Sequence, residues 1–500
     1  MCEFDATIKR LGFTFANSRS VGLFVLLLCV FIFLPACGLP PRHPPVSTAA
    51  RAELPLSEGL LQQGQWPADQ WWKNLNDDQL DELIERALAG APNLQQAQAR
   101  VNAAIRAIDV ARAEQGLHID ARAQASRARI SKNIGLLNGG SGAAEMPDIT
   151  SLGLIGLQFQ YDFDWWGKRR DAVNAAIDRA RASAADRIAA ALLLENGVAD
   201  SYCGWLFDRQ RLQITDQLIA LNERTLRIAQ YRRAQGIDSS DSEQQARAEL
   251  ANARSQRAAL GASAQLRLVQ LAALLGVAPD QLPPLQSRSP PEFQTALPDA
   301  ARIGLLGRRP DIIASRWRIE AAAQDVDAAR TAYLPNVSLS ALVFFVSDNF
   351  QKLFTDDSLL WSVGPAVTLP IFDAGRIRAQ YGSSRAQLES AIADYNEVVV
   401  EAAREVATQT LTLQQLQTQR DQQQIAVNAA AALRITTNAR AQQGLIDRRT
   451  QNTADMQWLR SQDAIVQINA QKLSTQLALI KALGGGYSES TTRDDSHAGR

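Results

Sequence analysis

The sequence predicts an α+β membrane protein built from two structural repeats, each with a pair of amphipathic strands and a very long helix. Large apolar side chains occupy every second position from Leu157 to Trp165, with glutamine and aspartate between them. That is the period of a strand with one apolar and one polar face. Lys168 to Arg233 contains no proline and is rich in helix formers. At 1.5 Å per residue it makes a rod of about 100 Å, longer than a compact domain needs.

Composition and motifs argue against an enzyme. The 500 residues include 52 basic and 52 acidic side chains, so no nucleic-acid partner is indicated. The three histidines, His43, His118 and His497, lie far apart. We find no phosphate-binding glycine loop, GxGxxG motif or nucleophile elbow. We therefore expect no catalytic site, no metal site and no cofactor.

Residues 1–36 have the features of an export signal peptide. Basic residues precede a 14-residue apolar run, Val21–Leu34, which is too short to span a membrane and suits the core of a signal peptide. Leu34-Pro35-Ala36-Cys37 resembles a lipoprotein signal, although Pro35 departs from the small or β-branched residue usual there. We expect cleavage after Ala36 and acylation of Cys37, for example with palmitate, which would anchor the chain to the membrane. Ordinary cleavage beside an incidental cysteine is the alternative.

The first repeat follows an extended, proline-rich linker over residues 37–60 and spans residues 61–290. A capped amphipathic helix begins near Asn76, Asp77 or Asp78. Strands are expected at about 118–131 and 150–164, joined through a glycine-rich loop as a hairpin. The long helix covers about 167–235 and turns at Gly236 into a return helix. Cys203, within the long helix, is expected to be a buried small apolar residue.

The long helix carries two apolar stripes. Leu212, Ile219 and Leu226 are seven residues apart, and a second set at the same spacing is offset by two residues. At about 100° per residue the two stripes lie on nearly opposite sides of the helix. A helix with a seam on each side has a neighbour on each side, which indicates a wall or tube of helices.

The second repeat spans residues 291–486 and copies the first. Three glycines recur after the same interval of 208 residues: Gly167 and Gly375, Gly236 and Gly444, and Gly276 and Gly484. Such a shared register indicates two copies of one supersecondary unit. Strands are expected at about 336–347 and 358–373, the second long helix at about 375–442, and a disordered tail at 487–500.

Four amphipathic strands cannot close a barrel alone, because about eight is the practical minimum, and open edges are not tolerated in lipid. The chain is therefore expected to be a homo-oligomer with a shared membrane barrel. A helical tube of about 100 Å leads away from it into the periplasm.

Several segments carry a family resemblance that covers nearly the whole mature chain. They are Trp71-Trp72-Lys73-Asn74-Leu75-Asn76-Asp77, Tyr161–Lys168, Arg308-Arg309-Pro310-Asp311-Ile312, Gly364-Pro365 with Pro370–Arg376, and Lys481–Gly486. The chain resembles the TolC/OprM-like outer membrane efflux proteins, most closely the NodT-type lipoprotein branch. This implies a homotrimer with a twelve-stranded transmembrane β-barrel, four strands per chain, continuous with a periplasmic α-helical barrel. It also implies the exit duct of a tripartite RND-type efflux system that exports small molecules such as drugs.

The resemblance also implies partners and sites. The partners are a periplasmic adaptor and an inner-membrane pump, with the adaptor docking at the helix turns around Gly236 and Gly444. Acidic residues of this family line a gate near these tips. The candidates in this chain are Asp238, Asp241, Asp447 and Asp455, with Arg448 and Arg449 beside them, although the aspartate usual a few residues past the turn glycine is not clearly matched.

Two other functions are consistent with parts of the sequence. A type I protein-secretion duct would have the same architecture. A structural envelope lipoprotein without a pore would explain the long helices, but it would leave the four amphipathic strands without a role.

Overall fold

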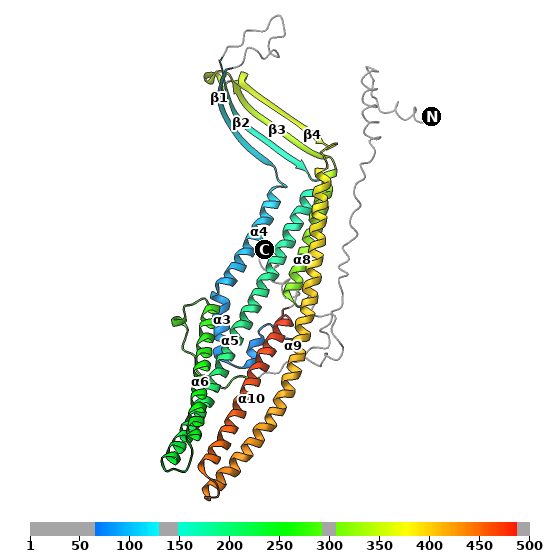
Figure 1. The fold of residues 1–500 in the computed structure, drawn as a ribbon. Helices are drawn as coiled ribbons and strands as arrows, with labels where there is room; N and C mark the ends of the chain where they lie inside the picture. The colour runs from blue at the N-terminus through cyan, green and yellow to red at the C-terminus, as the bar shows by residue number, and fades with distance from the viewer. Residues whose placement is uncertain (1–65, 130–148, 293–306, 488–500) are drawn as a thin grey trace, which may run out of the picture. The chain divides into compact units, whose positions relative to one another are not determined.

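The computed structural model of the chain describes residues 66–129, 149–292 and 307–487 (Figure 1). They belong to two compact units. One includes Gly116–Lys168 and Val326–Gly382 and holds the strands, and the other includes Arg169–Asp325 and most of the remaining helices. The expected export signal, Cys37 and the tail beyond Tyr487 lie outside the described residues.

The strand unit is a four-stranded antiparallel sheet in the order β1-β2-β3-β4. Its strands are β1 (His118–Arg129), β2 (Ile149–Phe163), β3 (Asn336–Ser347) and β4 (Leu359–Thr368). Each repeat contributes one hairpin, and β2 joins β3 across the two repeats. Figure 1 shows the four strands as one curved sheet.

The register places apolar residues on one face of this sheet. Leu157 lies opposite Val343, which lies opposite Trp361. These three side chains are 43%, 42% and 67% exposed. On the other face the row Gln160, Ser340 and Gly364 is polar or small, whereas the row Gly156, Phe344 and Leu360 is largely apolar. A sheet with an uncovered apolar face and a more polar reverse suits a lipid boundary on one side and water on the other.

β4 ends at Thr368, so the expected limit near residue 373 is wrong. Pro370 has no N–H to continue a ladder. Asp373 instead prepares the next helix, since its carboxylate accepts hydrogen bonds from the backbone N–H of Gly375 at 3.0 Å and of Ile377 at 2.8 Å. The alternating apolar pattern continues past Thr368, so the pattern alone predicts a longer strand. In the structure the chain instead prepares for α9, which Asp373 caps.

Two helices of 67 residues each dominate the helical part, as the proline-free stretches predict. They are α5 (Lys168–Ala234) and α9 (Arg376–Gln442). Each runs into a shorter return helix, α6 (Ser240–Leu275) and α10 (Arg448–Ala482) respectively. The remaining α-helices are α3 (Asp78–Gly90), α4 (Pro92–Ala113) and α8 (Pro310–Arg330).

The helical unit has its main core around the segment that follows the linker. Trp71 and Tyr202 are buried there, together with apolar residues of α3, α5, α6 and α10. Of the three expected capping residues, Asp77 caps α3, because its carboxylate accepts from the N–H groups of Gln79 at 3.0 Å and Leu80 at 3.3 Å. This cap stabilises the first turn of α3.

The glycines that mark the repeats share one backbone conformation. All six have φ between 71° and 92°: Gly167, Gly236, Gly276, Gly375, Gly444 and Gly484. A side chain at these angles is strained, whereas glycine is not. The 208-residue interval in the sequence therefore marks the same structural corner in both halves.

Candidate functional site

The two helix turns have the same hydrogen-bonding geometry. At the first turn, Gly236 N–H donates to Arg233 O and Ile237 N–H donates to Arg232 O, both at 2.9 Å. At the second, Gly444 and Leu445 make the equivalent bonds at 3.1 and 2.9 Å. This is the glycine-terminated cap that ends a helix sharply. Each long helix therefore reverses within a few residues and presents a compact tip.

Asp238 connects the two tips within one chain. Its carboxylate accepts two hydrogen bonds from Arg232, at 2.9 and 3.1 Å, and lies 3.6 Å from Arg449 at the start of α10. The hydrogen bond from Arg232 lowers the pKa of Asp238, and Arg449 contributes in the same direction. Asp238 is therefore charged at neutral pH and attracts arginines of both hairpins.

Asp447 has a different contact set. It is the N-cap of α10 and accepts from the backbone N–H of Thr450 at 2.8 Å and from its hydroxyl at 2.7 Å. The hydroxyl hydrogen bond from Thr450 lowers the pKa of Asp447. Its carboxylate stabilises the first turn of its own helix.

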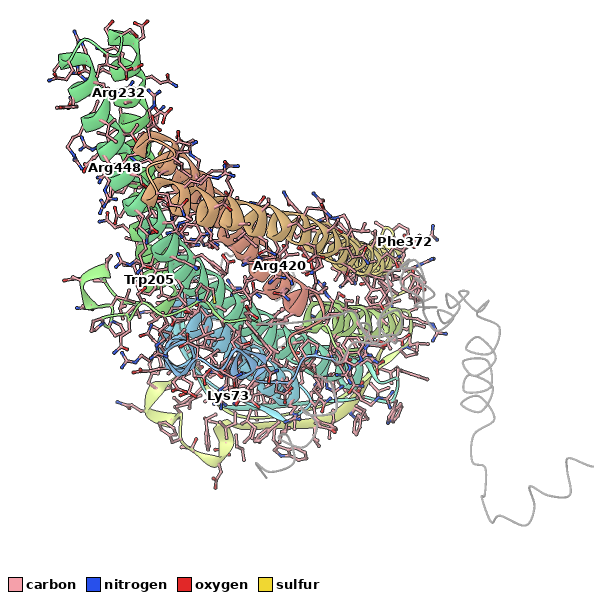
Figure 2. The ribbon with its side chains drawn as sticks, turned by 90° about the horizontal axis from the view of Figure 1, so that it is seen from below. Lys73, Trp205, Arg232, Phe372, Arg420 and Arg448 are labelled. Carbon is pink, nitrogen blue, oxygen red and sulfur yellow. The ribbon has the colours of Figure 1, made fainter. Side chains whose placement is uncertain are left out.

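The other candidate residues are not brought into this cluster. Asp455 pairs with Arg434 at 2.9 Å inside the α9–α10 hairpin, and Arg434 stacks 4.0 Å from the ring of Trp458. Asp241 is exposed and accepts from Ser240 at 3.2 Å. Arg448 is exposed at the second tip, where Figure 2 labels it on the orange hairpin, with Arg232 on the green one.

Sequence reasoning missed three features of the tips. The first is Arg232, the main partner of Asp238. The others are Ile237 and Leu445, which follow the turn glycines and are 60% and 67% exposed. They occupy equivalent positions in the two repeats, so the 208-residue interval could have identified them. Each tip thus displays one large apolar side chain.

Apolar contacts between α5 and α10 hold the α5–α6 hairpin against the α9–α10 hairpin, on the side of the tips toward the main core. Leu218 and Leu221 pack against Met456 and Leu459. Farther along, Arg211 and Asp463 form a bidentate pair at 2.8 and 3.0 Å. Charge-assisted bidentate pairs are geometrically specific, so this contact sets the register of one repeat against the other.

Buried polar groups lie in the core around Trp71. The Trp71 indole N–H donates to Glu195 at 3.2 Å, and burial raises the pKa of Glu195 to about 7. The Tyr202 hydroxyl donates to Asp77 at 2.8 Å. Cys203 is buried and unpaired, and burial raises the pKa of its thiol. Such a thiol is unreactive, in keeping with a packing role.

Known proteins share both the sequence and the fold. The family described as "Outer membrane efflux protein" matches residues 83–277 and 304–485. The chain is 30% identical over 477 residues to the multidrug resistance outer membrane protein MdtP of Escherichia coli, covering 92% of this chain and 96% of MdtP. It is 33% identical over 328 residues to the fusaric acid resistance protein FusA of Burkholderia cepacia, covering 64% of this chain and 60% of FusA.

Among solved structures, the outer membrane protein VceC of Vibrio cholerae superposes with a TM-score of 0.74 at 32% identity, over 85% of this chain and 100% of VceC. The expected resemblance and fold class are confirmed by these matches. These matches cover the hairpins, the long helices and both repeats, and the chain belongs to the outer membrane efflux protein family.

Proposed function

We propose that this chain is the outer membrane exit duct of a tripartite efflux system and passively exports small toxic molecules. Three copies would contribute twelve strands to one barrel, enough to enclose a channel. The observation that carries the proposal is the sheet, whose exposed apolar face is continuous from Leu157 through Val343 to Trp361. On the reverse face, polar and small residues such as Gln160, Ser340 and Gly364 suit a water-filled path. The resistance functions in the names of MdtP and FusA support small molecules as cargo.

The tips are the proposed docking surface for a periplasmic adaptor, which would connect the duct to an inner-membrane pump. Ile237 and Leu445 are exposed beside the turn glycines, and burial of such side chains favours association. The compact glycine turns allow a partner to approach the backbone closely.

Accumulation of a fluorescent dye in cells tests export through a docked tip. Deletion of the gene should increase dye retention, and the intact gene should restore efflux. Gly444→Pro should fail to restore it, because proline requires a φ near −65° whereas Gly444 has a φ of 72°. Gly261→Ala is the matched control, since an added Cβ there meets no atom. Unchanged retention together with a protein missing from the medium would instead indicate a type I secretion duct.

Asp238 is the proposed gate residue. Arg232 holds the carboxylate of Asp238 within the first hairpin, and the attraction of Asp238 to Arg449 would hold the two hairpins of each chain together in the closed duct. Asp238→Asn should raise the conductance of the purified protein in planar bilayers, while Asp241→Asn, at an exposed site, should not. Equal conductance of the Asp238 variant and the wild type would remove this residue from the gate.

Cys37 is the proposed site of lipid attachment in the outer membrane, on the strength of the preceding Leu34-Pro35-Ala36. Mass spectrometry of the mature protein should find an acylated N-terminal cysteine, and Cys37→Ser should abolish incorporation of labelled palmitate. An unmodified N-terminus elsewhere would favour ordinary signal cleavage.

A further inference from the structure

The helical unit contains a cavity of about 550 Å³ that the duct function leaves unexplained. Residues of α5, α9 and α10 line it, and Arg267 reaches it from α6. Cavities of this volume accommodate drug-sized molecules.

Two carboxylates and two guanidiniums line the cavity, but one of the guanidiniums is neutralised by a carboxylate outside it. Arg211 is already engaged in its bidentate pair with Asp463. That leaves Asp200, Asp208 and Arg267, two carboxylates for one guanidinium. The distances from Arg267 are long, 3.4 Å to Asp200 and 3.8 Å to Asp208. The cluster therefore carries an excess negative charge that its own arginine neutralises only loosely.

Asp200 is the carboxylate that a ligand could reach. Asp208 has a 13% exposed side chain and accepts from Ser263 at 2.8 Å. The side chain of Asp200 is 38% exposed. One of its oxygens accepts from Ser474 at 2.6 Å, and the other faces Arg267 at 3.4 Å. The second oxygen retains lone pairs for a stronger donor.

The remaining lining is amphipathic. Four glutamines supply amide donors and acceptors, and apolar residues lie beside them: Gln415, Gln419, Gln467, Gln471, Phe207, Leu416 and Leu473. We propose that this cavity is a binding site for a small organic cation, whose charged group pairs with Asp200 while its apolar body lies between α5, α9 and α10. The site rests on the cavity and its charges and does not depend on the proposed export function.

Binding of ethidium to the purified full-length protein in detergent tests the site, with fluorescence anisotropy as the readout and protein-free micelles as the blank. Asp200→Asn keeps the shape but removes the charge, and it should weaken binding about tenfold, the scale of a hydrogen bond to a charged group. Asp216→Asn is the matched control, because Asp216 is also on α5 and also pairs with an α6 arginine, Arg257, but is exposed and outside the cavity.

A second variant fills the cavity without changing its charge. Ala470→Trp adds a large side chain to the lining and should abolish ethidium binding. Circular dichroism confirms that each variant is folded. Wild-type affinity in folded Asp200→Asn or folded Ala470→Trp would overturn the proposal, as would equal weakening by the Asp216 control. Because the assay uses purified protein, its outcome is separate from that of dye export in cells.

Discussion

Glu195 should make the helical core less stable as the pH rises from about 4.5 to about 7. It is buried beside Trp71, and its pKa rises from 4.5 to about 7 mainly because burial disfavours the charged carboxylate. Below pH 4.5 both the folded and unfolded chains hold this proton. Between pH 4.5 and about 7 the unfolded chain releases it first, so the free energy of unfolding falls with increasing pH and then levels off.

The magnitude follows from that pKa difference. Each pKa unit corresponds to about 1.4 kcal/mol, so the raised pKa of Glu195 lowers the free energy of unfolding by about 3 kcal/mol at pH 8 and by under about 1 kcal/mol at pH 5. Glu195→Gln keeps an acceptor for the Trp71 indole but has no charge. The variant should therefore exceed the wild type in stability by about 3 kcal/mol at pH 8, with most of the gain absent at pH 5.

Guanidinium unfolding of the intact protein, followed by circular dichroism at 222 nm at both pH values, measures this difference. Glu82→Gln is the control, since its carboxyl is on the surface of α3 with 61% of the side chain exposed. A Glu195→Gln variant that is less stable than the wild type at pH 8, or that shows the same offset at both pH values, would refute the reasoning.

Three further predictions concern stability and can be measured by the same unfolding assay. Arg309 donates to Glu405 at 2.9 Å, and its side chain is only 8% exposed. Replacing Arg309 by Met should lower the free energy of unfolding by about 3–5 kcal/mol, and adding Glu405→Gln should recover part of this loss. Tyr202→Phe should cost about 1–2 kcal/mol, because Asp77 loses a buried donor; no change would show that Asp77 is satisfied without it. Gly486→Ala should lower the Tm, since the φ of Gly486 is 89° and an added Cβ would overlap the backbone of Ala68 and Asp69. An unaltered Tm would contradict this close packing.

The local pattern of the chain was enough to predict its elements and its fold class. Alternating side chains from Leu157 onward predict strands because the backbone of a strand has a period of two. Proline-free stretches predict two long helices, and both are 67 residues in the structure. The repeated glycines predict the corners because positive φ is a property of the individual residue.

The boundary of β4 and the contacts at the tips were decided by interactions that the local pattern does not contain. The strand ends at Thr368, although its apolar alternation continues to Ile371, and Asp373 then caps the start of α9. Of the candidate gate residues, Asp447 became a helix cap and Asp455 a partner within its own hairpin.

By itself, the sequence determined the periodicity, the repeat and the positions of the turns, because these depend on residues near one another along the chain. Only the tertiary structure decided which charges meet. Asp238 and Arg449 are 3.6 Å apart although they belong to different repeats. Trp71 reaches Glu195 across 124 positions. Such distances follow from how α5 packs against α10 and against the N-terminal segment, and this packing is a sum of many long-range contacts that no single stretch of sequence specifies.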